Sequence, residues 1–197
     1  MASRLFGEGA EARLYTASVF GRSIAVKSRE PKAYMVMELD LRLRAQRTRS
    51  EARLMQRALS LGVRVPRLIA LGRFSIYMER LDGRLLKDAR ITGRQATQIG
   101  RALARLHNGN VVHGDFTPAN IMEFGKELYI IDFGLAESSG RLEDKAIDVL
   151  LMKKALSKDV YPAFARAYAS DSREGKAVMG RLAEMEKRGR YQVRTLT

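Results

Sequence analysis

Residues 111–136 read VVHGDFTPANIMEFGKELYIIDFGLA, and this stretch decides how the rest of the chain is interpreted. It contains Asp115, then Asn120 five positions later, then Asp132 at the end of an apolar run. Asp115 is suited to orient an attacking hydroxyl or water. Asn120 and Asp132 supply hard oxygen ligands of the kind that Mg2+ takes while it also holds phosphates. The stretch therefore predicts metal-assisted phosphoryl transfer.

The order and spacing of these residues resemble a kinase catalytic loop followed by Asp-Phe-Gly, here residues 132–134. Near the start of the chain, Gly7 and Gly9 alternate with polar residues ahead of a strand-like segment, as in a kinase glycine-rich loop. Backbone amides approach phosphates closely only where side chains are absent. A Gly-Glu-Gly sequence alone is more often just a turn, so this interpretation depends on its neighbours.

Two charged residues complete the predicted site. Lys27 ends the strand-like Ile24-Ala25-Val26-Lys27, which is close to the Val-Ala-Ile-Lys of kinases, and is predicted to contact the α- and β-phosphates of ATP. Glu51 lies in a helix predicted between Asp40 and Leu61, at the edge of its apolar side. Glu51 is predicted to point toward Lys27; the alternative is an exposed Glu51 paired with Arg47.

The nucleotide base is predicted to bind at a hinge over residues 79–83, where Glu79 and Leu81 offer main-chain groups and Gly83 a flexible point. The catalytic residues predicted from the sequence are Asp115, Lys27 and Glu51, and the predicted metal ligands are Asn120 and Asp132. The predicted cofactor-binding residues are Gly7, Glu8, Gly9, Ala10, Ala25, Lys27, Glu79, Leu81 and Ile131.

The fold class predicted is α+β, a bilobal protein-kinase-like fold. Residues 1–80 are expected to form an N-lobe with a five-stranded sheet and one helix, including a hairpin turned by Gly21-Arg22 in a type II′ turn. Residues 81–197 are expected to form a small helical C-lobe with a basic tail. Its first helix starts with a capping box of Thr92 and Gln95, and its last helix runs from about residue 171 to 188.

The segment after residue 134 is short for a protein kinase. Thirteen residues separate Gly134 from Asp148, and there is no Ala-Pro-Glu motif. The C-lobe is therefore predicted to lack an activation segment. Asp148 is expected to anchor the catalytic loop by hydrogen bonds, and His107 and His113 to structure it rather than act as acid or base.

The composition narrows the class of protein. A chain of 197 residues without cysteine and with two histidines excludes disulfides and makes a zinc site improbable. No apolar run approaches the ~20 residues needed to span a bilayer, and the start lacks a signal-peptide apolar region, which predicts a cytoplasmic protein with no membrane contact. The net charge of +14 slightly favours contact with nucleic acid or an acidic partner over a merely basic surface. The arginines between residues 42 and 53 and the tail after residue 186 are the candidate regions.

Taken together, five segments resemble the small atypical Ser/Thr kinase subunit of the archaeal-type KEOPS complex: residues 113–120, 131–135, 143–148, 9–12 and 47–52. The tail also resembles the Arg-Gly-Arg ending of that family, although Tyr191 departs from its pattern. The resemblance implies an Mg2+- and ATP-dependent kinase or ATPase that takes part in making threonylcarbamoyladenosine in tRNA. It also implies partners: the threonylcarbamoyl transferase (Kae-type) subunit, the other small KEOPS subunits, and tRNA itself.

Two other functions stay open from the sequence. One is a small-molecule phosphotransferase of the aminoglycoside or choline kinase type, which shares His-Gly-Asp with an asparagine five residues after the aspartate. The other is a non-catalytic scaffold that binds nucleotide and RNA.

Overall fold

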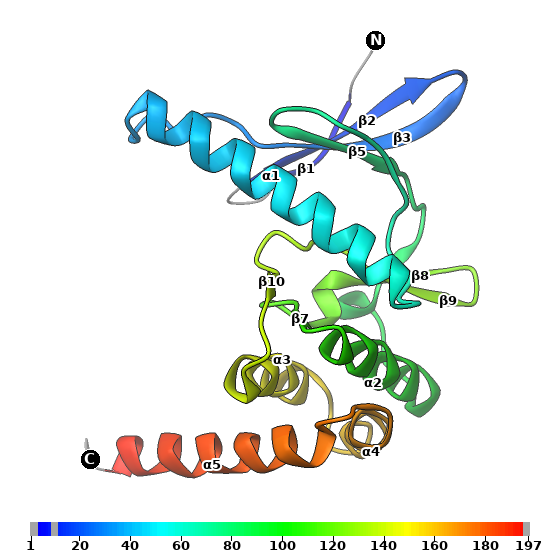
Figure 1. The fold of residues 1–197 in the computed structure, drawn as a ribbon. Helices are drawn as coiled ribbons and strands as arrows, with labels where there is room; N and C mark the ends of the chain where they lie inside the picture. The colour runs from blue at the N-terminus through cyan, green and yellow to red at the C-terminus, as the bar shows by residue number, and fades with distance from the viewer. Residues whose placement is uncertain (1–3, 9–11, 195–197) are drawn as a thin grey trace.

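The fold comes from a computed structural model, which describes residues 4–8 and 12–194, with side chains through Arg188. Its upper lobe contains the five-stranded sheet expected from the sequence, with every strand antiparallel to its neighbours (Figure 1). The order is β1-β2-β3-β5-β4, where the strands span Arg4–Glu8 (β1), Arg13–Val19 (β2), Arg22–Ser28 (β3), Leu68–Leu71 (β4) and Ser75–Glu79 (β5).

The turn between β2 and β3 differs from the prediction by one residue. Its two central residues are Phe20 and Gly21, because Val19 pairs directly with Arg22. Both have positive φ, 49° and 74°, which is the backbone of a type I′ turn rather than type II′. Glycine occupies the second central position, and Phe20, at the first, is fully exposed.

Helix α1 (Met37–Ser60) crosses the sheet and leads down to the lower lobe (Figure 1). It begins three residues before the predicted Asp40 and ends one residue before the predicted Leu61. Leu54, Met55 and Ala58 are buried as the apolar pattern predicts, whereas Leu59, which the pattern places on the same side, is 50% exposed. Its first turns extend past the sheet in Figure 1.

The lower lobe consists of four helices under small sheets. Helix α2 (Gly93–Asn108) opens with the predicted capping box: Thr92 accepts from the Gln95 backbone N–H, and the Gln95 side chain accepts from the Thr92 N–H. The other elements are β6 (Arg84–Leu85), β7 (Val111–Val112), β8 (Ile121–Phe124), β9 (Glu127–Ile130), β10 (Glu137–Ser138), the 3-10 turns η1 (Leu86–Asp88) and η2 (Pro118–Asn120), and helices α3 (Leu142–Ala155), α4 (Tyr161–Asp171) and α5 (Gly175–Arg194).

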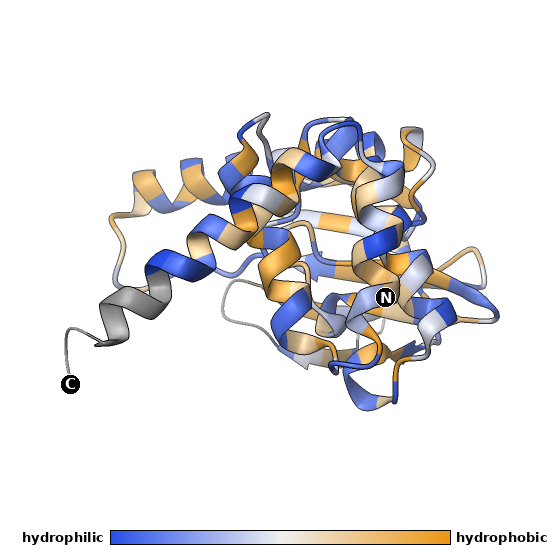
Figure 2. Cartoon of the chain, turned by 90° about the horizontal axis from the view of Figure 1, so that it is seen from below, coloured by the Kyte–Doolittle hydropathy of each residue, from blue (hydrophilic) through white to orange (hydrophobic). Residues whose placement is uncertain are grey.

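The last helix begins later than predicted. Asp171 ends α4, Ser172 has an extended backbone, and α5 starts only at Gly175. Val178 and Leu182 of α5 are buried as expected. Seen from below in Figure 2, hydrophobic and hydrophilic residues alternate along α5, as expected for a helix with one buried side.

Gly83 is needed for a close contact between the hinge and the lower lobe. A Cβ at this position would lie 2.4 Å from the carbonyl oxygen of Glu123 in β8. The structure therefore gives Gly83 a steric role where the sequence suggested a flexible point.

Only residues 135–141, including the short strand β10, connect the Asp-Phe-Gly sequence to α3. The predicted lack of an activation segment is thus confirmed. In the part of the chain that the structure describes, none of the helices has the length and apolar character that crossing a membrane requires.

Candidate active site

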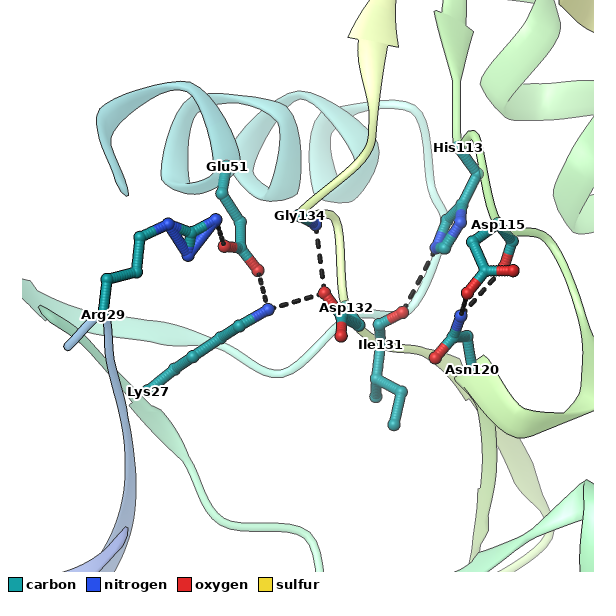
Figure 3. Close-up of polar contacts among 9 residues, drawn as sticks. All are labelled: Lys27, Arg29, Glu51, His113, Asp115, Asn120, Ile131, Asp132 and Gly134. Atoms are coloured by element: carbon teal, nitrogen blue, oxygen red, sulfur yellow. Dashed lines mark hydrogen bonds and ion pairs between the residues drawn. The ribbon is translucent and has the colours of Figure 1, made fainter. Parts of the chain in front are cut away.

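Lys27, Glu51 and Asp132 come together between the two lobes (Figure 3). The Lys27 ammonium donates to Glu51 Oε1 at 2.7 Å and to Asp132 Oδ1 at 2.5 Å. Lys27 is the second-last residue of β3 and faces α1, and Glu51 is 2% exposed on the side of α1 that faces the sheet. The Lys27–Glu51 pair predicted from the sequence is therefore present, and Glu51 is not an exposed surface residue.

Arg29 belongs to the same cluster and was missed in the sequence. Its Nη2 donates to Glu51 Oε2 at 2.9 Å, so that each Glu51 oxygen accepts from a different cation. Arg29 is 3% exposed, and its Nε has no hydrogen-bond partner among the described residues. The signal was available: side chains alternate along an extended chain, so the second residue after Lys27 points to the same side.

Asp132 has an unusual backbone and a perturbed carboxylate. Its φ is +61°, a left-handed conformation that non-glycine residues adopt rarely. Burial raises the pKa of Asp132, but attraction to Lys27 and hydrogen bonds from Lys27 and the Gly134 N–H outweigh this and hold the pKa below its usual range. Asp132 is therefore a carboxylate at neutral pH, with Oδ1 engaged by Lys27 and Gly134.

Asp115 and Asn120 form the second half of the site. Asn120 Nδ2 donates to the backbone oxygen and to Oδ2 of Asp115, each at 2.8 Å, and the turn η2 places the two side chains together (Figure 3). Because the amide nitrogen is committed to Asp115, the amide oxygen of Asn120 is left for a cation. The loop that carries Asp115 is held by Asp148, as predicted.

The buried anchor under this loop contains both histidines. Asp148 accepts from the backbone N–H groups of His113 at 2.7 Å and Gly114 at 2.9 Å, and it contacts His107 Nε2 at 3.2 Å. His107 Nδ1 lies 2.7 Å from the Tyr168 hydroxyl, and His113 Nε2 lies 3.2 Å from the carbonyl oxygen of Ile131. Both histidines are buried and structural, as the sequence predicted.

This anchor predicts a loss of stability in acid. Burial lowers the pKa of His107, and its contacts with Asp148 only partly oppose the shift. His107 of the unfolded chain therefore binds a proton near pH 6.5, whereas His107 of the folded chain does so only at lower pH. The free energy of unfolding falls as the pH drops below about 6.5 and levels off below the folded pKa of His107. One such group contributes a slope approaching about 1.4 kcal/mol per pH unit. Urea unfolding at pH 7 and pH 5.5 should show a smaller pH dependence in His107→Gln; an equal dependence would contradict this assignment.

A hollow of about 570 Å3 lies beside the predicted hinge, where Arg80 lines it. Ser23 lines it, and Ser23, Ala25 and Lys27 share one face of β3 because side chains alternate along a strand. The hollow is thus on the same face as Lys27, at the opposite end of the strand. It is lined by Arg4, Leu5, Phe6, Thr16, Ala17, Ser18, Ser23 and Arg80.

The remaining residues predicted to contact the cofactor differ in how near they lie to the site. The Glu79 N–H already donates to the Arg67 oxygen at 2.9 Å, so of its two main-chain groups only the carbonyl can serve a base. Glu8 pairs with Arg13 at 2.9 Å on the surface, and Leu81 is half-buried beside the hollow's Arg80. Gly7 is in β1 and Ile131 directly precedes Asp132, whereas Gly9 and Ala10 lie outside the described residues.

The polar groups present fit a magnesium ion held jointly with a nucleotide. No group of three or more His, Cys, Asp or Glu side chains among the described residues could hold a metal by itself. Asn120 and Asp132 offer one amide oxygen and one carboxylate, both hard ligands. Mg2+ typically binds through one or two protein oxygens plus phosphates and water, so a sparse donor set of this kind suits it.

The sheet with a Lys–Glu pair, the catalytic loop and the Asp-Phe-Gly sequence together define a protein-kinase-like fold. Consistent with this, a Rio2 kinase from Chaetomium thermophilum, solved with ADP, Mg2+ and a phosphoaspartate, superimposes with a TM-score of 0.66 over 95% of this chain and 71% of its own, at 17% identity. Residues 19–155 match the family model of the RIO domain.

Two relatives narrow the family further. The KEOPS complex subunit Bud32 of Pyrococcus abyssi is 32% identical over 98% of both chains. A probable bifunctional tRNA threonylcarbamoyladenosine biosynthesis protein of Methanobrevibacter smithii is 35% identical over 95% of this chain, which spans only 36% of that protein's length. The chain belongs to the RIO-domain family, in the branch that contains Bud32.

Proposed function

We propose that this chain is an Mg2+- and ATP-dependent atypical serine/threonine protein kinase with ATPase activity. The observation that carries the proposal is the cluster of Lys27, Glu51 and Asp132 facing the Asp115–Asn120 pair in a RIO-family chain. These are the charges and oxygen ligands that phosphoryl transfer requires, because the protein contributes positioning and electrostatic stabilisation rather than covalent chemistry.

In this proposal each group has one role. Lys27 holds the α- and β-phosphates, and Glu51 orients Lys27. Asn120 and Asp132 are the ligands for Mg2+, which when bound would neutralise charge on the phosphates. Asp115 accepts a hydrogen bond from the attacking hydroxyl or water and thereby aims its oxygen at the terminal phosphate. The nucleotide base lies in the hollow beside the hinge.

The same comparisons support a place in tRNA modification. The match to one third of a bifunctional threonylcarbamoyladenosine protein suggests that the other part of that protein has a separate counterpart that works with this chain. We therefore place the chain in the cytoplasm as a KEOPS subunit. Its partners there are the Kae-type threonylcarbamoyl transferase, the other small subunits and tRNA, and residues 1–80 and 81–197 serve as its two lobes.

The test is ATP hydrolysis and phosphoprotein formation by the purified chain, measured with and without the threonylcarbamoyl transferase. We expect Mg2+-dependent hydrolysis that rises when the transferase is added. Phosphate transfer to a small alcohol that does not respond to the transferase would instead establish a small-molecule phosphotransferase. Nucleotide binding with no turnover in either condition would leave only a scaffold role.

A further inference from the structure

The outer face of α1 carries a straight line of arginines. At about 100° per residue, Arg42, Arg49, Arg53 and Arg57 fall within an arc of about 80°, opposite the side of α1 that is buried. They span about 22 Å along the axis at 1.5 Å per residue. All four are exposed. We call these four residues the α1 arginine line.

The cations of this line form no ion pairs among the described residues, although the exposed Glu38 lies four residues before Arg42. None of the four forms an ion pair with a described residue, whereas many other surface arginines do, such as Arg64 with Glu127 at 3.1 Å. Between residues 41 and 60 the only acidic residue of α1 is Glu51, which is buried against Lys27. Gln46 and Gln56 lie beside the arginines and are exposed hydrogen-bond donors.

This arrangement differs from an ordinary solvated helix face. Such faces mix Glu or Asp with Lys or Arg four residues apart, which stabilises the helix. Here Arg49 and Arg53, and Arg53 and Arg57, are like charges at that spacing, and each pair opposes helix formation by about 0.2–0.5 kcal/mol. A ligand that supplies regularly spaced negative charge would neutralise the arginines and remove this repulsion.

The chemistry of the line favours phosphates over carboxylates scattered on a protein surface. Guanidinium groups bind phosphate oxygens through two parallel hydrogen bonds, and Gln side chains also donate to phosphates. A polynucleotide backbone presents such groups continuously over the full length of the line. The identity of the polynucleotide rests on the proposed function, since the relatives act in tRNA modification by name.

We propose that the α1 arginine line is a binding site for the phosphate backbone of RNA, with tRNA as the natural ligand. The contacts are to phosphates, so affinity depends strongly on salt and little on base sequence. The RNA lies on the outer side of the helix whose inner side presents Glu51 to Lys27.

The experiment measures binding of an unmodified tRNA transcript to the full chain by fluorescence anisotropy from 50 to 300 mM KCl. The test variant is R42Q/R49Q/R53Q/R57Q. The matched control is K87Q/K126Q/K158Q/K176Q, which removes the same charge from four exposed lysines elsewhere. Circular dichroism and ATP turnover are recorded for all three proteins.

We expect the arginine variant to bind tRNA at least about tenfold more weakly at 50 mM KCl, with a log–log salt slope reduced by about 3. The lysine control should change both quantities much less. Equal losses in the two variants would show that only net charge matters, and unchanged tRNA binding would point to an acidic protein ligand; either result overturns the proposal. ATP turnover should be equal in all three, and its absence in the wild type would count against the proposed function alone.

Discussion

Replacing Asp132 with alanine is expected to lower Mg2+-dependent ATP turnover by about 10^3-fold or more, equivalent to about 4 kcal/mol of transition-state stabilisation. Asp132 is the one carboxylate proposed as a metal ligand, and its lowered pKa keeps it charged at neutral pH. The effect should be on turnover rather than on folding. The Asp132 side chain is 51% exposed, so its loss from the Lys27 pair changes stability little, while Lys27 keeps Glu51.

The matched control for this change is Asp171→Ala. Asp171 also pairs with a basic residue, Arg101 at 3.6 Å, but on the lower lobe at the end of α4. Turnover should be that of the wild type in the control, and the thermal midpoints of both variants should stay close to the wild-type value. If Asp132→Ala retained wild-type turnover, the assignment of Asp132 as a metal ligand would be wrong.

Contacts between residues that are close in the sequence could be predicted, because the spacing of the residues fixes how their side chains lie. Asp115 and Asn120 are separated by a single turn, so their contact follows from the chain's own geometry. Lys27 and Glu51 were also predicted, since each lies in an element whose buried side is readable from its apolar pattern. The five strands follow for the same reason.

The missed features depend on contacts between distant segments. Arg29 follows the last residue of β3; alternation places it on the same side as Lys27, and the packing of α1 over the sheet then buries it against Glu51. The predicted start of α5 was wrong because the sequence of residues 171–174 is compatible with a continuous helix. The break is made by a close approach, in which a Cβ on Gly175 would lie 2.5 Å from the carbonyl oxygen of Ala169.

The second large effect is expected from Glu51→Met, which should lower the free energy of unfolding by about 3–5 kcal/mol. Glu51 is the only counter-charge among the described residues for Arg29, and it also neutralises Lys27. Without it, two cations face each other in a buried site. Urea unfolding with a single cooperative transition is the measurement.

The double variant Arg29→Met/Glu51→Met separates this buried charge from catalysis. Replacing a buried ion pair by apolar residues is often neutral for stability, so the double variant should recover more than half of the loss seen in Glu51→Met, while Lys27 keeps Asp132. ATP turnover should stay low in both variants, because Lys27 has lost the carboxylate that orients it. If the double variant is less stable than Glu51→Met, then Arg29 stabilises the fold independently of Glu51, and the shared-carboxylate account of this cluster is wrong.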